Sequence, residues 1–127
     1  MDWVDNLISQ MSSGKIFAKI DGQEVAVVVT SEAKDFFVKN KDLLRRVGKS
    51  TFKSFLALIN EKKEEQAFML LLAKMDAEDI IARLNQNAGN LAIDTDQREK
   101  FIEALKAFAW DVGKKVFLKV LLALLVV

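Results

Sequence analysis

Four residue types are missing from this 127-residue chain: histidine, cysteine, tyrosine and proline. Without histidine there is no imidazole base that titrates near neutral pH, and no nitrogen ligand for zinc or haem. Without cysteine there is no thiolate nucleophile, no disulfide and no iron–sulfur ligand. Histidine is also the commonest acid–base group in catalysis, so these absences argue against an enzyme. We therefore expect no catalytic residue, no metal site and no cofactor.

An excess of one charge is also lacking, because 19 basic and 18 acidic side chains leave a net charge of +1. No overall field therefore favours a nucleic-acid partner. Apolar residues make up 51% of the chain, which is typical of globular proteins. The length and the absence of a proline- or glycine-rich linker predict a single domain, residues 1–127. The N-terminus is acidic where a secretory signal would be basic, so we expect a cytoplasmic protein.

The chain ends in a strongly apolar run, residues 116–127, in which Lys119 is the single polar side chain. A helix that is apolar on all sides is expected to be buried in the core, in a subunit interface or in lipid. The run would cover about 18 Å as a helix, too short for a hydrocarbon core of about 30 Å, so it is not a transmembrane span. If a second subunit covers this helix, the expected contact residues are Phe117, Val120, Leu121, Leu124 and Leu125.

Residues 15–30 have the pattern of a β-hairpin. Asp21 and Gly22 form the dipeptide that a two-residue type I′ turn requires, because both turn positions have positive φ. Folding about this turn places Lys19 opposite Glu24, a favourable pair of opposite charges. The β-branched run that follows disfavours a helix. Because two strands alone are marginal in water, we expect the hairpin to lie on helices or on a second copy of itself.

Outside the hairpin, apolar residues recur with a helical period. A helix is expected within residues 1–13, and a helical bundle that ends in the apolar helix is expected in residues 31–127. The sequence therefore predicts a mainly α fold of the α+β class, a compact bundle of about five helices with one N-terminal β-hairpin.

Within the bundle, Gly48 and Gly89 are expected to end helices. Asp76, followed by Asp79 three residues later, is expected to cap a new helix. The side chains of this helix that are expected to face inward are Ile80, Ile81 and Leu84.

The last segment, residues 95–127, is too long to be one straight helix in a compact domain. It would extend for about 50 Å, whereas a domain of this size spans only about 30 Å. We therefore expect a break near Gly113.

A basic stretch lies between residues 39 and 53, where six basic side chains accompany one acid, Asp42, for a local charge of +5. Such a cluster could bind phosphates of nucleic acid or anionic lipid. No aromatic pattern suited to base stacking accompanies it, so a solvated helical face balanced by acids elsewhere is the favoured interpretation. The basic residues are Lys39, Lys41, Arg45, Arg46, Lys49 and Lys53.

Two short motifs match ligand sites in part but lack required residues. Residues 48–51 read GKST, the end of a phosphate-binding P-loop, but Leu43 stands where the first glycine is needed. Residues 85–96 faintly match a calcium loop, but the turn position lacks glycine and Asp96 replaces the final glutamate. Neither motif predicts a binding site.

The sequence thus favours a non-enzymatic interaction protein, expected to be a homo-oligomer through its hairpin, its apolar C-terminal helix or both. The main alternative is a peripheral membrane or lipid-binding protein whose C-terminal helix docks on a bilayer or lines an apolar pocket. Nucleic-acid binding through residues 39–53 is a third and weaker alternative.

Overall fold

The computed structural model describes residues 2–85, 95–112 and 116–125. The described residues are mostly helical and carry one antiparallel hairpin near the N-terminus, as the sequence predicts. In chain order the elements are α1 (Trp3–Met11), β1 (Lys15–Ile20), β2 (Gln23–Val28), α2 (Ser31–Lys39), α3 (Lys41–Val47), α4 (Lys49–Asn60), α5 (Glu64–Leu84), α6 (Thr95–Val112) and α7 (Val116–Leu124).

The prediction of about five helices is wrong, because the described ranges contain seven. Asn40 divides the first segment of the bundle into α2 and α3. Its side-chain amide donates to the backbone carbonyl of Phe36 at 2.8 Å, a local hydrogen bond that competes with helix continuation. The last segment forms α6, which ends at Val112, and α7, which begins at Val116. Gly113, the predicted break, lies outside the described residues.

The helix α5 is continuous over 21 residues, so the prediction of a new helix at Asp76 is also wrong. The neighbouring residues, such as Ala73 and Ala77, are strong helix formers and do not interrupt the backbone. The Asp76 carboxylate instead pairs with Arg98 of α6, with Oδ1 and Nη2 2.6 Å apart. Gly89, which was expected to end this segment, lies outside the described residues.

The hairpin is confirmed, including its register. Lys19 lies opposite Glu24 in the antiparallel pair. Asp21 has φ 53° and Gly22 has φ 79°, the positive values that a type I′ turn requires. The hairpin contacts α7, so it lies on helices of the same chain.

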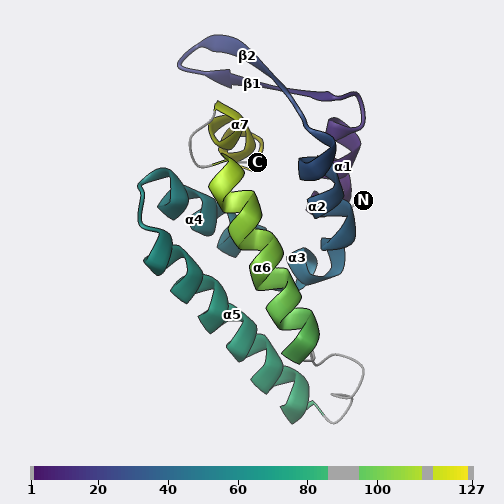
Figure 1. Ribbon diagram of the computed structural model, residues 1–127, viewed down its shortest axis with the longest axis vertical. Helices are drawn as coiled ribbons and strands as arrows, with labels where there is room; N and C mark the ends of the chain where they lie inside the picture. The colour runs from purple at the N-terminus through teal and green to yellow at the C-terminus, as the bar shows by residue number, and fades with distance from the viewer. Residues whose placement is uncertain (1, 86–94, 113–115, 126–127) are drawn as a thin grey trace.

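The helix α7 lies beneath the hairpin and also packs on α4 (Figure 1). Val120 and Leu121 have no exposed surface, and they belong to one hydrophobic core that includes residues of all seven described helices. The remaining elements surround this centre. In Figure 1, α1, α2 and α3 lie on one side of α7, α4 and α5 lie on the other, and α6 runs between them.

The turn geometry predicts that Gly22→Val destabilises the protein. A β-branched residue resists positive φ, at a cost of about 1–3 kcal/mol. Gly22→Asn is the matched control, because asparagine tolerates this backbone region and should keep most of the stability. Thermal unfolding compares the two variants. Equal melting temperatures for Gly22→Val and the unchanged protein would contradict the turn assignment.

The position of α7 predicts that Leu121→Ala lowers the free energy of unfolding by about 2–5 kcal/mol, through lost burial and the cavity left behind. Lys119→Ala, on the exposed side of the same helix, should change it little. Leu121→Asp should prevent folding, because it buries an unpaired charge. A Leu121→Asp protein that melts like the unchanged chain would show that α7 does not belong to the core.

Candidate interaction surface

The side chains proposed from the sequence as an oligomer interface are mostly covered within the single chain. Four of them are buried, namely Phe117, Val120, Leu121 and Leu125. The fifth, Leu124, is partly buried against the same core. Because the hairpin and α4 already cover α7, these residues form part of the interior and present little surface to a second subunit. Of the core, a subunit interface and lipid, the core is therefore the environment in which these side chains lie.

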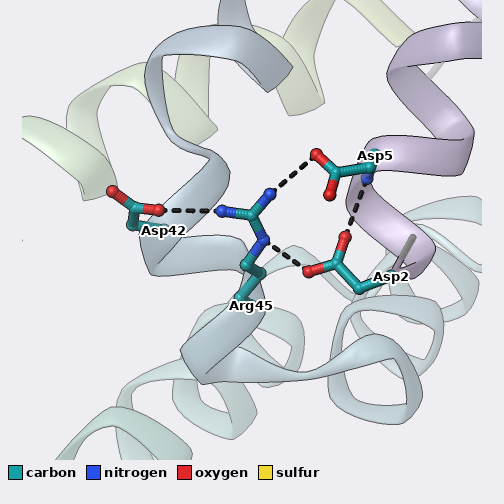
Figure 2. Close-up of polar contacts among 4 residues, drawn as sticks. All are labelled: Asp2, Asp5, Asp42 and Arg45. Atoms are coloured by element: carbon teal, nitrogen blue, oxygen red, sulfur yellow. Dashed lines mark hydrogen bonds and ion pairs between the residues drawn. The ribbon is translucent and has the colours of Figure 1, made fainter.

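Arg45, at the middle of the basic stretch, is surrounded by three carboxylates, as Figure 2 shows. Its Nη2 donates to Asp5 Oδ1 at 2.7 Å, its Nη1 donates to Asp42 Oδ1 at 2.9 Å, and its Nε donates to Asp2 Oδ2. Asp2 also caps α1, because its Oδ1 accepts the backbone N–H of Asp5 at 2.9 Å. The guanidinium group therefore joins α3 to the start of α1.

This arrangement shifts the protonation of both partners. The backbone N–H of Asp5 is the main cause that lowers the pKa of Asp2, and the nearby guanidinium lowers it further. The hydrogen bond to Asp2 is in turn the main cause that raises the pKa of Arg45. Both shifts favour the charged forms, so the cluster is a stable ionic contact at neutral pH.

Arg46, the second arginine of the basic stretch, points to a different ionic network. Its Nη2 lies 3.5 Å from Asp79 Oδ1 on α5. Arg98 of α6 reaches the same carboxylate, with Nη1 3.7 Å from Asp79 Oδ2, and also pairs with Asp76. Three helices thus meet at Asp79, and both arginines of the stretch form contacts within the chain.

The four lysines of the basic stretch do not take part in these networks of ion pairs. Within residues 2–85, 95–112 and 116–125, none of them forms an ion pair with a described carboxylate. They come from three helices: Lys39 from α2, Lys41 from α3, and Lys49 and Lys53 from α4. With the arginines paired, the charge available to a phosphate backbone is smaller than the sequence indicates.

The most exposed apolar surface of a helix lies on α5, where the sequence predicts core. Ile80, Ile81 and Leu84 were expected to face inward, but they are 59%, 51% and 76% exposed. The buried face of α5 is instead formed by Ala67, Leu71, Met75 and Ala82. The prediction was wrong because the face of α5 that carries Leu71 and Met75 packs in the core, and the face that carries Ile80 and Leu84 points away from it.

Exposed residues of α5, all apolar except Gln66, form a continuous stripe, which we call the α5 seam. Its positions alternate in spacing between four and three residues, which keeps them on one face of a helix. Met69 and Ile81 lie at its edges and are also exposed. The α5 seam consists of Gln66, Leu70, Ala73, Ala77, Ile80 and Leu84.

This alternation is the heptad pattern with which one helix packs against another. The spacing is present in the sequence, but the helix start expected at Asp76 divided it into two shorter segments. The sequence pattern does not indicate that no other element of the chain covers this face. Large apolar surfaces of this kind often mark contacts with another molecule. We therefore take the α5 seam as the candidate interaction surface.

The described residues contain neither a candidate metal centre nor a candidate membrane span. No group of three or more acidic residues within those ranges is placed to hold a metal ion. None of the helices described combines the length and the apolar character needed to cross a membrane.

Comparison of the chain with protein families, with curated proteins and with solved structures found no match. The interpretation of the α5 seam therefore depends on its own residues and their placement.

The lowered pKa of Asp2 predicts a stability that depends on pH. A carboxyl group whose pKa is lowered by folding stabilises the protein above its unfolded pKa of about 4, and this contribution is lost as the pH falls through the folded pKa. Asp2→Asn keeps an oxygen that can accept the Asp5 N–H but removes the charge that pairs with Arg45. We expect the variant to melt below the unchanged protein at neutral pH, and the gap to close in strong acid.

Thermal melts over a series of pH values test this expectation. Asp96→Asn is the control, because Asp96 lies at the surface and, among the described residues, its ion-pair partner is the exposed Lys100. Its melting temperature should differ little from that of the unchanged protein throughout. A gap for Asp2→Asn that is as large in strong acid as at neutral pH would contradict the proposed ionic contact.

Proposed function

We propose that this chain is a non-enzymatic interaction protein that self-associates through the α5 seam. The observation that carries the proposal is the exposed heptad stripe on a helix of 21 residues. The occupant is a second copy of the chain, with its own α5 lying antiparallel. The cytoplasm, the location expected from the sequence, remains part of this proposal.

The order of residues along the α5 seam supports pairing with itself. The seam is symmetric about the level of Met75: Leu70 and Ile80 lie five residues from it, and Ala73 and Ala77 lie two residues from it. In an antiparallel pair, Leu70 of each copy therefore meets Ile80 of the other, and Ala73 meets Ala77. The small alanines at the centre allow the two backbones to approach closely, while the large side chains at both ends exclude water.

The charges beside the seam favour the antiparallel orientation over the parallel one. Glu65 and Arg83 lie near opposite ends of α5 on the same flank and are both exposed. An antiparallel pair places Glu65 of one copy near Arg83 of the other, whereas a parallel pair leaves these two side chains at opposite ends of the interface. Asp76 lies near the middle of that flank, and its pairing with Arg98 neutralises it. Antiparallel helix dipoles are also the favourable arrangement.

Other surfaces are less suited to this role. The outer face of the hairpin exposes Phe17 and Val28, a smaller apolar area flanked by Lys15 and Lys19. Docking of α7 on a bilayer would require its buried side chains to leave the core. Nucleic-acid binding through residues 39–53 would rely on lysines alone, because Arg45 and Arg46 hold carboxylates of the same chain.

The proposal predicts that Ile80→Lys reduces self-association without unfolding the chain. The side chain is mostly exposed in the single chain, so the change leaves the core intact but brings a charge into the paired seam. Light scattering over a range of concentrations measures the mass. Phe17→Lys is the control, because it introduces the same charge at an exposed apolar site on the hairpin. Dissociation by Phe17→Lys and not by Ile80→Lys would assign the contact to the hairpin instead.

The orientation can be tested by cross-linking, since the chain has no cysteine of its own. A disulfide requires Cα atoms roughly 4.4–6.8 Å apart. A mixture of Ala73→Cys and Ala77→Cys chains should therefore give mainly the mixed disulfide, and each variant alone should cross-link less. Ser54→Cys, exposed on α4, measures random collision. A monomer at all concentrations would overturn self-association, and self-linked Ala73→Cys as the main product would overturn the antiparallel register alone.

A further inference from the structure

A groove of about 550 Å³ lies between α2 and α6, under β2 and beside the first residues of α7. Its floor is aromatic. The rings of Phe36 and Phe108 are stacked, with centroids 4.4 Å apart and planes at 7°, and Phe117 meets Phe108 edge to face. All three side chains are buried. The floor is therefore held by the core and does not depend on surface side chains for its shape.

The groove exists because α2 and α6 carry small side chains on the sides that line it. Ala33 of α2 and Ala104 and Ala107 of α6 line its walls. The two helices are in contact, but alanines there leave a space above the aromatic rings. Val27 and Val28 of β2 cover one end. A volume of this size is within the range of pockets that hold drug-sized molecules.

The charged residues that line the groove, among those that the structure describes, are mainly acidic. Glu32 and Asp35 come from α2 and Asp111 comes from α6, and Lys39 is the one cation in this described lining. These carboxylates form no ion pair with any residue in the described ranges. The groove thus combines an apolar interior with a rim whose described residues carry an excess of two negative charges. Such a rim attracts a cation and repels a carboxylate or phosphate.

We propose that this groove binds a lipophilic amine, a molecule with a hydrocarbon or aromatic body and one positively charged amino group. The body lies on the rings of Phe36 and Phe108, where burial of apolar surface provides the affinity. The amino group lies at the rim near Asp35 and Asp111. This binding site lies between α2 and α6, apart from the α5 seam, and does not rest on self-association.

Three probes with the same twelve-carbon chain test the chemistry: dodecylamine and dodecanoate, each below its micelle concentration, and dodecanol, below its solubility limit. Isothermal titration calorimetry with the full chain measures binding. We expect one saturable site for dodecylamine per chain, with an affinity about tenfold above that for dodecanoate, because the head groups differ in the sign of their charge. Dodecanol should bind between the two.

Two variants locate the site. Ala107→Phe fills the groove from an exposed position on α6, so it should abolish binding of all three probes while thermal melting remains cooperative. The double variant Asp35→Asn with Asp111→Asn should weaken dodecylamine about fivefold and leave dodecanol unchanged, as expected for two exposed charges. Glu103→Gln is the control, because this exposed residue on α6 does not line the groove. It should leave all three affinities unchanged.

Three results would overturn the proposal. The first is the absence of saturable dodecylamine binding to the unchanged chain. The second is dodecanoate or dodecanol binding as tightly as dodecylamine, since the rim would then not select a cation. The third is undiminished dodecylamine binding by a folded Ala107→Phe chain, since the amine would then bind elsewhere. Repeating the titration with Ile80→Lys keeps the result independent of self-association, and the same affinity is expected.

Discussion

The burial of α7 is the constraint on which the rest of the structure depends. Its side chains are apolar on nearly every side, so the helix needs neighbours all around it. The hairpin covers it on one side and α4 packs against it on another. The other helices then complete the core, which includes residues such as Phe37 and Phe52 that have no exposed surface. The outer face of α5, which carries Ile80 and Leu84, takes no part in enclosing α7 and remains exposed.

The sequence predicted well those features that depend on neighbouring residues. The hairpin register follows from Asp21 and Gly22, whose turn fixes which residues face each other. The prediction from sequence was wrong at α5, because this helix has two apolar faces and only one of them packs in the core. Size alone favours Ile80, Ile81 and Leu84 as core residues, but the face that packs in the core is the one that carries Leu71 and Met75. Which face is covered is decided by other parts of the chain, and no local pattern contains that information.

The basic stretch illustrates the same limit for charges. Six basic residues close together in the sequence indicate a positive surface, but Arg45 meets carboxylates 43 and 40 residues away. Arg46 meets Asp79, which is 33 residues away. The composition already contains enough carboxylates to pair with these arginines, since acids and bases are nearly balanced in number. Only the fold determines which charges remain for solvent, and here it leaves mainly lysines from three different helices.

The contact between the hairpin and α7 has a consequence for how the chain acquires its structure. The two elements that meet there are separated by most of the sequence, since β1 begins at Lys15 and α7 at Val116. During synthesis the hairpin leaves the ribosome long before the helix that it covers. Until α7 follows, the inner face of the hairpin and the part of α4 that packs on α7 lack this native partner. Closing so large a loop is slow, so the core is completed only after α7 has been synthesised.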